Sequence, residues 1–592
     1  MYRNKALLTA FLLCIGLIAH TAEPIRPSVL ISENTFPSVH DPWLAGKNAA
    51  ALTRYAFDNI GVAELSLTKG KGGFVDFSDS PDALSVNASV ASFFRLSSRA
   101  VVFGSMSYNN FSGDDMAGSA FISRHLPFDI VEDSLTNTGT KHQDTYHLTG
   151  GLGIDIHKGF SLGARLDYTA ANYAKYKDLR HKNKLMDLDL TAGFYLPISL
   201  TESMELSLGA NYLYHRTTES LQFSTYGKND KVYNSLVSYA NFMGHVEQFG
   251  NVGYTDKSRE MPLVSDYNGV GAQINAQRLL VNGYWLLVYN SFTYAHRCGY
   301  YGRKSPYTIT YTGHESDLYH YDARLSVSSP RGSRFSLDLS LSAENLRNDA
   351  YNYRELQNEQ GATYYEYYTP VKTANKLWTD GTIAFTAELG SLHIPNGQRS
   401  MVNGQRSMVN GQRSMVNGQR STVNGQRSMV NGQRSMIPVW KFNAGLNWLH
   451  REQTAYAYPF RRHQDIRSTE PFVSVCRNIL ASRKSNTFWT LALDFSFLKG
   501  SGEPFEDLTY QTPSDKQEQP PTMDAYLWRE YTWLTAAQYH VGGSVAYSFI
   551  MPRTHLRTFI RLSLSHRKAN ETSEYSLGRD FTTGSLTIGC AF

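Results

Sequence analysis

The chain has 592 residues, a formal net charge of +5, a mean hydropathy of −0.38 and 13% aromatic residues. Six arginines of one repeated tract create the positive balance, because the charge without them would be −1, and this excludes a general basic face for nucleic acid. The sequence contains no P-loop, HExxH or CxxC motif, and the three cysteines after residue 22 are far apart. We therefore expect no metal, no cofactor and no enzymatic activity.

Residues 1–22 have the pattern of a secretory signal peptide. Arg3 and Lys5 precede an apolar core from Ala6 to Ala19, and a plausible cleavage end follows at Ala22. This core is too short to span a bilayer, and no later run reaches about 18 apolar residues. A mature chain in a membrane would therefore cross it as strands. Residues 23–57, which contain four prolines, are expected to form a periplasmic N-terminal segment.

From residue 58 onward, apolar and polar residues alternate in one segment after another, as in 335–342 and 489–497. This period is typical of strands with one face in lipid and one in water. Short turns, such as those near 157–159 and around Pro197, alternate with long polar loops. The pattern predicts an all-β, transmembrane, antiparallel up-and-down β-barrel with short periplasmic turns and long extracellular loops. We expect about 18 strands, in a range of about 14 to 18, within a domain covering 58–592. The predicted strands are 58–68, 85–96, 100–109, 144–156, 160–170, 184–196, 203–214, 267–279, 283–294, 316–328, 332–344, 375–392, 438–449, 468–480, 486–498, 537–550, 554–566 and 582–592.

The last predicted strand ends on an aromatic residue. Leu586, Ile588, Cys590 and Phe592 lie on one face, and the residues between them are small or polar. This ending resembles the C-terminal signal of bacterial outer-membrane barrels, in which the last strand ends in Phe and closes the barrel. The resemblance implies that Phe592 is an assembly signal read by the barrel-assembly machinery, and that the protein lies in the bacterial outer membrane in contact with its lipid.

Three short motifs resemble a family of Bacteroidetes-type outer-membrane barrels catalogued as a domain of unknown function. The first is Trp43–Leu52, which is similar to the family's opening Trp…Gly-x-Asn-Ala-Ala-Gly-Leu stretch, with Ala51 in place of the usual Gly. The others are Ser92–Leu96 and Phe103–Tyr108, which are similar to its second and third strands. The resemblance implies the fold and the location, and it carries no known activity.

A repeat of seven residues, Asn-Gly-Gln-Arg-Ser-Met/Thr-Val/Ile, occurs six times within 396–436. Because seven is odd, each residue would change faces between successive copies of a strand, so no constant apolar face can form. The tract is expected to be a polar loop inserted on the short-turn side. The alternative is an arginine-rich segment that binds anionic partners.

The alternation places several charged side chains toward the lumen. In this position they either pair with one another or select a solute. The predicted lumen-lining residues are Arg165, Asp167, Asp187, Asp189, Arg324, Asp338, Asp494 and Arg561.

Three functions stay open at this point. The first is a porin-like channel or an uptake component for a small or amphipathic solute. The second is a non-enzymatic envelope scaffold that partners a surface lipoprotein or a transport complex, which a lumen blocked by 23–57 or by the 215–266 loop would favour. The third is a secreted, β-rich adhesin, which outward faces carrying charges would favour.

Overall fold

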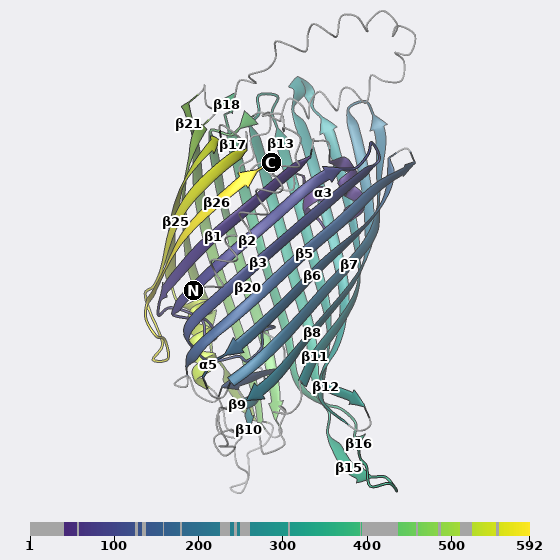
Figure 1. Ribbon diagram of the computed structural model, residues 1–592, viewed down its shortest axis with the longest axis vertical. Helices are drawn as coiled ribbons and strands as arrows, with labels where there is room; N and C mark the ends of the chain where they lie inside the picture. Colours follow the sequence, from purple (N-terminus) through teal and green to yellow (C-terminus); the bar gives the residue numbers. More distant parts are fainter. Residues whose placement is uncertain are drawn as a thin grey trace, which may run out of the picture.

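The protein is a tall, closed barrel of tilted antiparallel strands (Figure 1). The computed structural model describes residues 41–55, 59–124, 128–132, 138–157, 159–177, 180–224, 237–241, 246–248, 261–305, 308–390, 392–393, 436–457, 460–482, 487–509, 524–551 and 556–592. The predicted signal peptide, residues 23–40 and repeat residues 396–435 lie outside these ranges.

Eighteen strands form the barrel wall, and each of them overlaps one strand that the sequence predicts. The fold and the strand number are therefore confirmed. The barrel strands are β1 (Ile60–Gly72), β2 (Asp82–Arg95), β3 (Ala100–Met116), β5 (Gly139–His157), β6 (Phe160–Lys175), β7 (Arg180–Thr201), β8 (Met204–Ser224), β11 (Met261–Leu279), β12 (Trp285–Ser305), β13 (Thr308–Ser328), β14 (Arg334–Ala350), β17 (Val371–Leu389), β20 (Trp440–Ala457), β21 (Phe460–Ser482), β22 (Thr487–Gly502), β24 (Gln538–Ile550), β25 (Arg557–Ala569) and β26 (Asp580–Ala591).

The barrel closes where β1 pairs with β26, from Val62 opposite Ala591 to Gly72 opposite Phe581. Phe592 continues this seam, because its amide donates to the Gly61 carbonyl at 2.9 Å and its carbonyl accepts from the Gly61 amide at 2.7 Å. A Cβ on Gly61 would lie 2.3 Å from the Phe592 ring. Glycine at position 61 therefore makes room for the terminal aromatic ring, which packs on the first strand.

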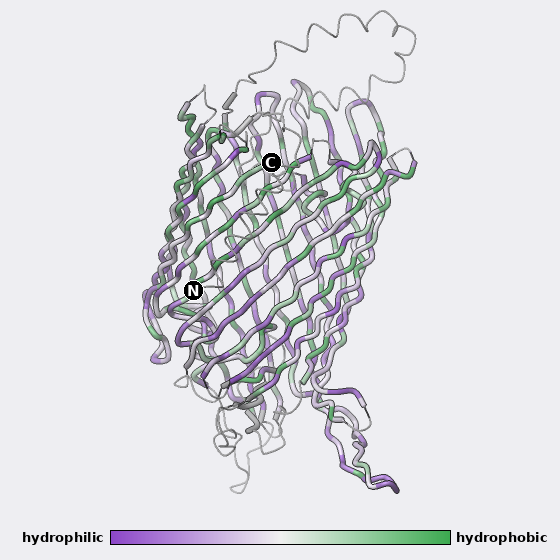
Figure 2. The backbone as a smooth tube through the Cα atoms, in the orientation of Figure 1, coloured by the Kyte–Doolittle hydropathy of each residue, from purple (hydrophilic) through white to green (hydrophobic). Residues whose placement is uncertain are grey.

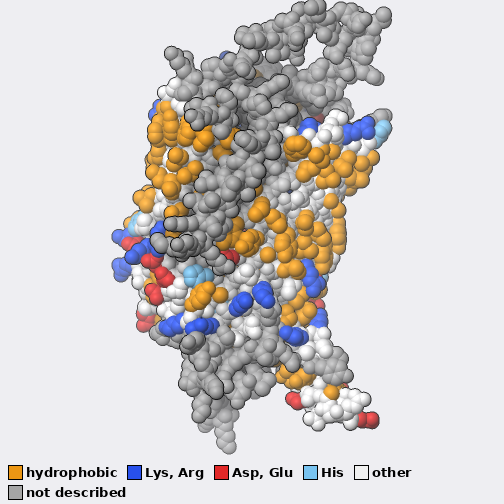
Figure 3. All heavy atoms as spheres, in the orientation of Figure 1, with side chains coloured by type: hydrophobic (Ala, Val, Ile, Leu, Met, Phe, Trp, Pro, Cys, Tyr) orange, Lys and Arg blue, Asp and Glu red, His pale blue; other side chains and the backbone are white. Residues whose placement is uncertain are grey.

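The outer face of the barrel is apolar. Alternate side chains along the strands, among them Leu166, Val270, Leu493 and Leu562, project outward and are 41–69% exposed to the surroundings. Figure 2 shows the resulting alternation along the strands, and Figure 3 shows hydrophobic side chains covering much of the outer surface. Exposed apolar residues in a continuous belt need lipid, since a water-soluble protein rarely exposes such an area. The protein is a membrane-spanning β-barrel.

Many strands extend further toward the loop end than the sequence predicts. β12, for example, continues to Ser305 and β13 begins at Thr308, whereas the predicted strands are 283–294 and 316–328. Beyond the bilayer both faces meet water, so the hydrogen-bonded ladder continues while the apolar alternation disappears. Polar sequence there marks strand extensions as well as loops.

The expected turn around Pro197 is wrong, because Pro197 lies inside β7 and pairs with Ser207 of β8. The pairing of β7 with β6 ends at Tyr195. Pro197 therefore stands where β7 has a neighbour on one side only, a position that tolerates a residue without an amide hydrogen.

Shorter elements decorate the two ends of the barrel. At the loop end, β15 and β16 form a hairpin that projects away from the wall, while β4, β9 and β10 form a small sheet (Figure 1). None of the described helices is long and apolar enough to cross a membrane. The remaining elements are α3 (Pro42–Ala45), η2 (Ala49–Arg54), β4 (Phe128–Glu132), β9 (Val237–Asn241), β10 (Val246–Gln248), η4 (Val281–Gly283), β15 (Tyr353–Gln357), β16 (Thr363–Tyr367), β18 (Leu392–His393), β19 (Met436–Ile437), β23 (Glu506–Thr509) and α5 (Asp524–Thr535).

Candidate functional site

Residues 41–55 lie inside the barrel at its short-turn end. Asp41 caps α3 through a hydrogen bond from the Trp43 amide, and Asn48 caps η2 through one from the Ala50 amide. Trp43 is 2% exposed and packs edge-on against Tyr195 of β7 and Tyr289 of β12. We call this stretch the inserted segment. It lies against the inner face of the wall, in the part of the chain that the sequence assigns to a periplasmic segment.

Glycines on neighbouring strands form the groove that holds the inserted segment. Gly153, Gly163 and Gly193 lie directly opposite one another on β5, β6 and β7. A Cβ on Gly163 would lie 2.2 Å from the Ala50 nitrogen, and one on Gly153 would lie 2.6 Å from the Ala49 carbonyl oxygen. These contacts are to backbone atoms, which cannot move aside as a flexible side chain could. The wall is therefore shaped for the backbone of this segment.

Polar contacts fix the inserted segment laterally. The Asn48 side-chain amide donates to the Phe194 carbonyl at 2.9 Å and to Gln273 Oε1 at 3.0 Å. Arg54 donates to the Tyr195 hydroxyl at 2.7 Å and forms an ion pair with Glu205 at 3.4 Å. Hydrogen bonds at both ends of the segment specify one docked position, which we call its seat, because a shift along the wall would leave buried polar groups without partners.

Three of the predicted lumen residues belong to this seat. Arg165 donates to Asp167 through Nε at 2.7 Å and Nη2 at 3.0 Å, and its Nη1 donates to the Gly46 carbonyl at 3.1 Å. Lys47 forms an ion pair with Asp189, whose side chain is 8% exposed. Arg165 and Asp189 therefore contact the inserted segment directly, and Asp167 holds Arg165 in place. Each of the three charges has a partner of opposite charge.

Residues 159–163 read Gly-Phe-Ser-Leu-Gly, which matches the GxSxG motif of serine hydrolases. In those enzymes the serine stands exposed on a turn between a strand and a helix. Here Ser161 lies in a strand hairpin and is 1% exposed; its hydroxyl donates to the Gly159 carbonyl and shares a hydrogen bond with the Thr53 hydroxyl. The serine supports the seat of the inserted segment and gives no hydrolase site.

A belt of paired charges continues around the lumen wall from Asp187. His215 contacts Asp187 at 2.8 Å and stacks on Tyr267, with ring centroids 4.5 Å apart. The Tyr267 hydroxyl accepts from Arg297 at 3.0 Å, and Arg297 pairs with Glu344. Asp187 is thereby tied into a rigid chain of side chains across β7, β8, β11, β12 and β14.

The same belt reaches the opposite side of the loop end. Lys376 pairs with Glu344 at 2.7 Å and lies 3.9 Å above the Trp378 ring. Arg451 lies over the same ring at 4.3 Å and pairs with Glu530 of α5 at 2.8 Å. Because each of these charges contacts an opposite charge or an aromatic face, the belt stabilises the wall and holds α5.

Arg324 and Asp338, two further predicted lumen residues, form an ion pair between β13 and β14. Asp338 also accepts from the Ser336 hydroxyl at 3.2 Å. The other two predicted residues, Asp494 and Arg561, lie in a different setting.

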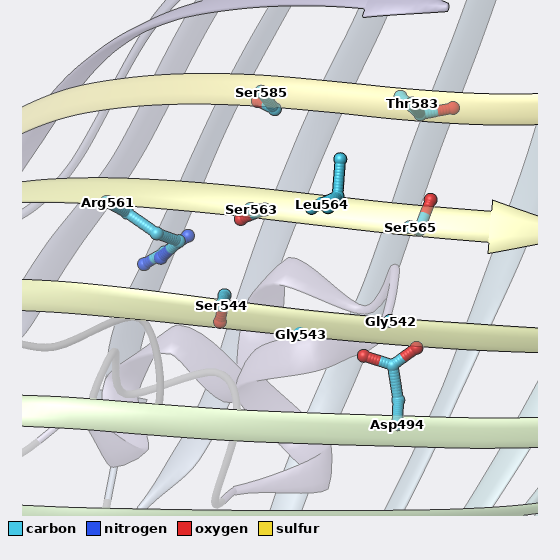
Figure 4. A pocket seen from close by; sticks show the side chains of 10 residues that line it. All are labelled: Asp494, Gly542, Gly543, Ser544, Arg561, Ser563, Leu564, Ser565, Thr583 and Ser585. Carbon is cyan, nitrogen blue, oxygen red and sulfur yellow. The ribbon is translucent and has the colours of Figure 1, made fainter.

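Asp494 and Arg561 line a hollow of about 270 Å³ on the inner face of β22, β24, β25 and β26. Figure 4 shows the two side chains extending toward β24 from different ends of the hollow, with Ser544, Ser563 and Ser585 between them. The Asp494 side chain is 45% exposed and contacts His540 Nδ1 at 3.4 Å. This hollow combines two opposite charges with several serine and threonine hydroxyl groups.

At the loop end, the chain after β3 folds back into the barrel. Phe121 and Ile130 pack with Phe223 and Tyr301 from the inner face of β8 and β12. Glu219 accepts from the amides of Ile122 and Ser123, at 2.7 and 2.9 Å. We call residues 117–124 and 128–132 the inward loop. Burial raises the pKa of Asp129 in this loop to about 7, against hydrogen bonds from Ser119 and Ile130 that lower it.

Helix α5 lies on the other side of the same mouth and packs against the β1–β2 loop. The ring centroids of Phe74 and Trp533 are 5.1 Å apart, and Arg529 donates to the Val75 carbonyl at 3.3 Å. Burial, followed by the charges of Glu530 and Asp79, raises the pKa of Asp76 to about 7. Both sides of the outer mouth thus carry a half-buried carboxyl group whose pKa is raised.

Sequence reasoning selects the charged residues and names 23–57 as a possible block of the lumen, but it does not predict the docked position of the inserted segment, the inward loop or α5. The signal for the first is a row of glycines at inward positions on consecutive strands. For α5, the signal is a run rich in aromatic and aliphatic residues, Asp524–Thr535, inside the expected loop 499–536. No group of three or more His, Cys, Asp or Glu side chains could hold a metal ion within the described part of the chain.

Comparison with known proteins gives one family and a set of distant barrels. The sequence profile of a family of unknown function, DUF6850, matches residues 49–408. No curated protein matches the sequence significantly. Among solved structures, BauA, the ferric preacinetobactin receptor from Acinetobacter baumannii, has a TM-score of 0.37 and 10% identity, over 91% of this chain and 80% of that one. The outer membrane transporter YddB from Escherichia coli has a TM-score of 0.36 and 8% identity, over 90% and 81%.

Proposed function

The chain belongs to the family of unknown function DUF6850, and we propose that it is an uptake channel for a small or amphipathic solute. The observation that carries the proposal is the asymmetry of the lumen. The inserted segment contacts the inner wall from β2 to β12, whereas β22 and β24–β26 present a hollow with accessible polar side chains. A solute that follows this second wall meets hydroxyl groups and a pair of opposite charges.

Single-channel conductance in a planar bilayer tests the proposal. We expect steady, small currents from the refolded full chain, because the inserted segment narrows the short-turn end. Deletion of residues 396–436 separates a contribution of the repeat from that of the barrel. Equal currents in both forms would make the repeat dispensable for conduction, and current only after its deletion would identify it as a plug. Absence of current from both forms, with protein shown to be inserted and folded, would contradict the channel proposal.

A non-enzymatic envelope scaffold is the second candidate, and the elements at both ends of the lumen favour it. The inserted segment occupies the short-turn end, while the inward loop and α5 lie at the outer end. The β15–β16 hairpin extends outward from the barrel and offers a surface for a lipoprotein or transport partner (Figure 1). Co-purification of a partner from outer membranes, lost on deletion of residues 353–367, would support this candidate over the channel.

The apolar outer face opposes the third hypothesis, a secreted adhesin. That hypothesis needs charged side chains at outward positions, where Val270, Leu493 and Leu562 stand 57–69% exposed. We expect the protein to fractionate with outer-membrane lipid, and its appearance as a soluble secreted form would revive the adhesin.

A further inference from the structure

We propose that the hollow on β22, β24, β25 and β26 binds a short zwitterionic peptide. The proposal rests on the uptake function above and names the class of solute. Three features of the hollow support this ligand class: the register of its strands, the charges at its two ends and the hydroxyl groups between them.

Strand register arranges the hollow in three rows across the wall. In the first row, Asp494 lies opposite Gly542, and Gly542 lies opposite Ser565. Two residues further along, Ser544 faces Ser563, which faces Ser585 on the next strand. The order along the strands is therefore a carboxylate, a row of three hydroxyl groups and then, two residues beyond, the guanidinium of Arg561.

Gly542 is required for the acidic end. A Cβ at this position would lie 2.2 Å from Asp494 Oδ2, so the carboxylate occupies the space that a larger residue would fill. Its exposed fraction of 45% leaves it accessible from the lumen. The acidic end is thus both shaped by the wall and open to a solute.

The two charged ends are a peptide length apart. Arg561 is aligned with Ala546 on β24, four residues from Gly542, which corresponds to about 13 Å along the strand. Figure 4 shows both side chains reaching inward from these levels, which shortens the gap. An extended peptide spans about 3.5 Å per residue, so a dipeptide or tripeptide fits between the two charges.

The chemistry of the hollow matches the two termini and the amides of such a peptide. Asp494 would accept from the α-ammonium group, and Arg561 would donate to the α-carboxylate in a charge-assisted pair. The serine hydroxyl groups of the middle row both donate and accept, as amide C=O and N–H groups require.

Isothermal titration calorimetry of the detergent-solubilised full chain tests the ligand class, with alanyl-alanine as the probe. We expect it to bind at least tenfold more tightly than its N-acetylated, C-amidated equivalent, because the neutral analogue lacks both charges. Asp494→Asn and Arg561→Gln should each lower the affinity about tenfold. The double variant Asp494→Lys with Arg561→Glu should recover part of the loss, since the zwitterion can bind in reverse.

Arg347→Gln, which removes an exposed arginine on β14 that pairs with Asp349, is the matched control and should leave binding unchanged. Equal binding of the neutral analogue, tighter binding of a monosaccharide, or insensitivity to both single variants would overturn the proposal. Liposome swelling with the same solutes then separates this proposal from the channel. Binding without swelling would contradict the uptake function but leave the peptide site supported. Swelling without preference for the zwitterion would contradict the peptide site but leave the uptake function supported.

Discussion

The wall made by β5–β8, β11 and β12 differs from the wall made by β22 and β24–β26 in what fills the lumen beside it. On the first wall, inward glycines admit the backbone of the inserted segment, and the charges around them pair with it. On the second wall, small side chains leave a hollow that is lined by Asp494, Arg561 and several serines, and the Asp494 side chain is 45% exposed. Small inward-facing residues can therefore make room either for a fixed internal element or for a mobile solute. Close contacts with the backbone of another segment identify the first case.

Loss of the Trp43 side chain should have the largest effect on this difference. Trp43→Ala removes a buried ring that packs between Tyr195 and Tyr289, and we expect it to cost about 3–5 kcal/mol of docking free energy. Amide hydrogen exchange of residues 41–55 should accelerate accordingly, and single-channel currents should rise. Trp489→Ala on the lipid-facing side of β22 is the control and should leave that exchange unchanged. Unaltered protection in Trp43→Ala would mean that polar contacts alone hold the segment.

Filling the glycine groove should undock the same segment by a different route. Gly163→Val places a side chain where a Cβ already lies 2.2 Å from the Ala50 nitrogen, and we expect a penalty of about 1–3 kcal/mol from overpacking. Exchange of residues 41–55 should rise while the β5–β7 amides keep their protection. Gly584→Val is the matched control, because no heavy atom lies within 4 Å of its Cβ position. If both variants behave alike, the groove is not specific for the segment.

Raising the pH should loosen the outer mouth on both walls. Asp76 and Asp129 have pKa values of about 7, above the ordinary aspartate value of about 3.9. Between about pH 4 and 7 the folded state therefore keeps protons that the unfolded state has lost, so the stability of the docked loops falls as pH rises and levels off above 7. The protection factors of amides in α5 and in the inward loop, which correct for the faster intrinsic exchange at higher pH, should be larger at pH 5 than at pH 8.

Single substitutions separate the two sides of the mouth. Asp76→Asn should remove the pH dependence of α5 alone, since the asparagine oxygen can still accept from the Phe77 amide. Asp129→Asn should do the same for the inward loop alone. A pH dependence that survives in both single variants would assign it to other groups.

The sequence predicts the barrel strands well because lipid on one side and water on the other impose a period of two on every membrane-spanning segment. Leu162 and Leu166 against Arg165 and Asp167 are an example, and β6 lies where this alternation puts it. The same reasoning places Asp494 and Arg561 toward the lumen, although it cannot tell that these two share a hollow. That depends on register across three strand pairs, which local sequence does not encode.

The docked position of the inserted segment cannot be predicted by such reasoning, for a physical reason. Its contacts join Trp43, Asn48 and Ala50 to residues more than 100 positions away, and its two short helical turns have no apolar period of their own. α5 is hidden in a similar way, because its buried side chains meet the barrel mouth only after the wall has closed. The sequence of an element that packs inside a barrel can be explained only once the structure of the completed wall is known.

The smallest expected effect concerns the ion pair between Lys47 and Asp189. Lys47 is 57% exposed, so solvent screens its charge, and Lys47→Met should weaken the docking of residues 41–55 by only about 0.5 kcal/mol. Asp189 keeps a hydrogen bond from Thr191 at 3.3 Å, which limits the cost of losing the lysine. Hydrogen exchange at low and high salt measures this contribution, since high salt should bring the wild type toward the variant. A loss comparable to that of Trp43→Ala would show that charge, and not the fit of the backbone to the glycine groove, keeps the inserted segment in the lumen.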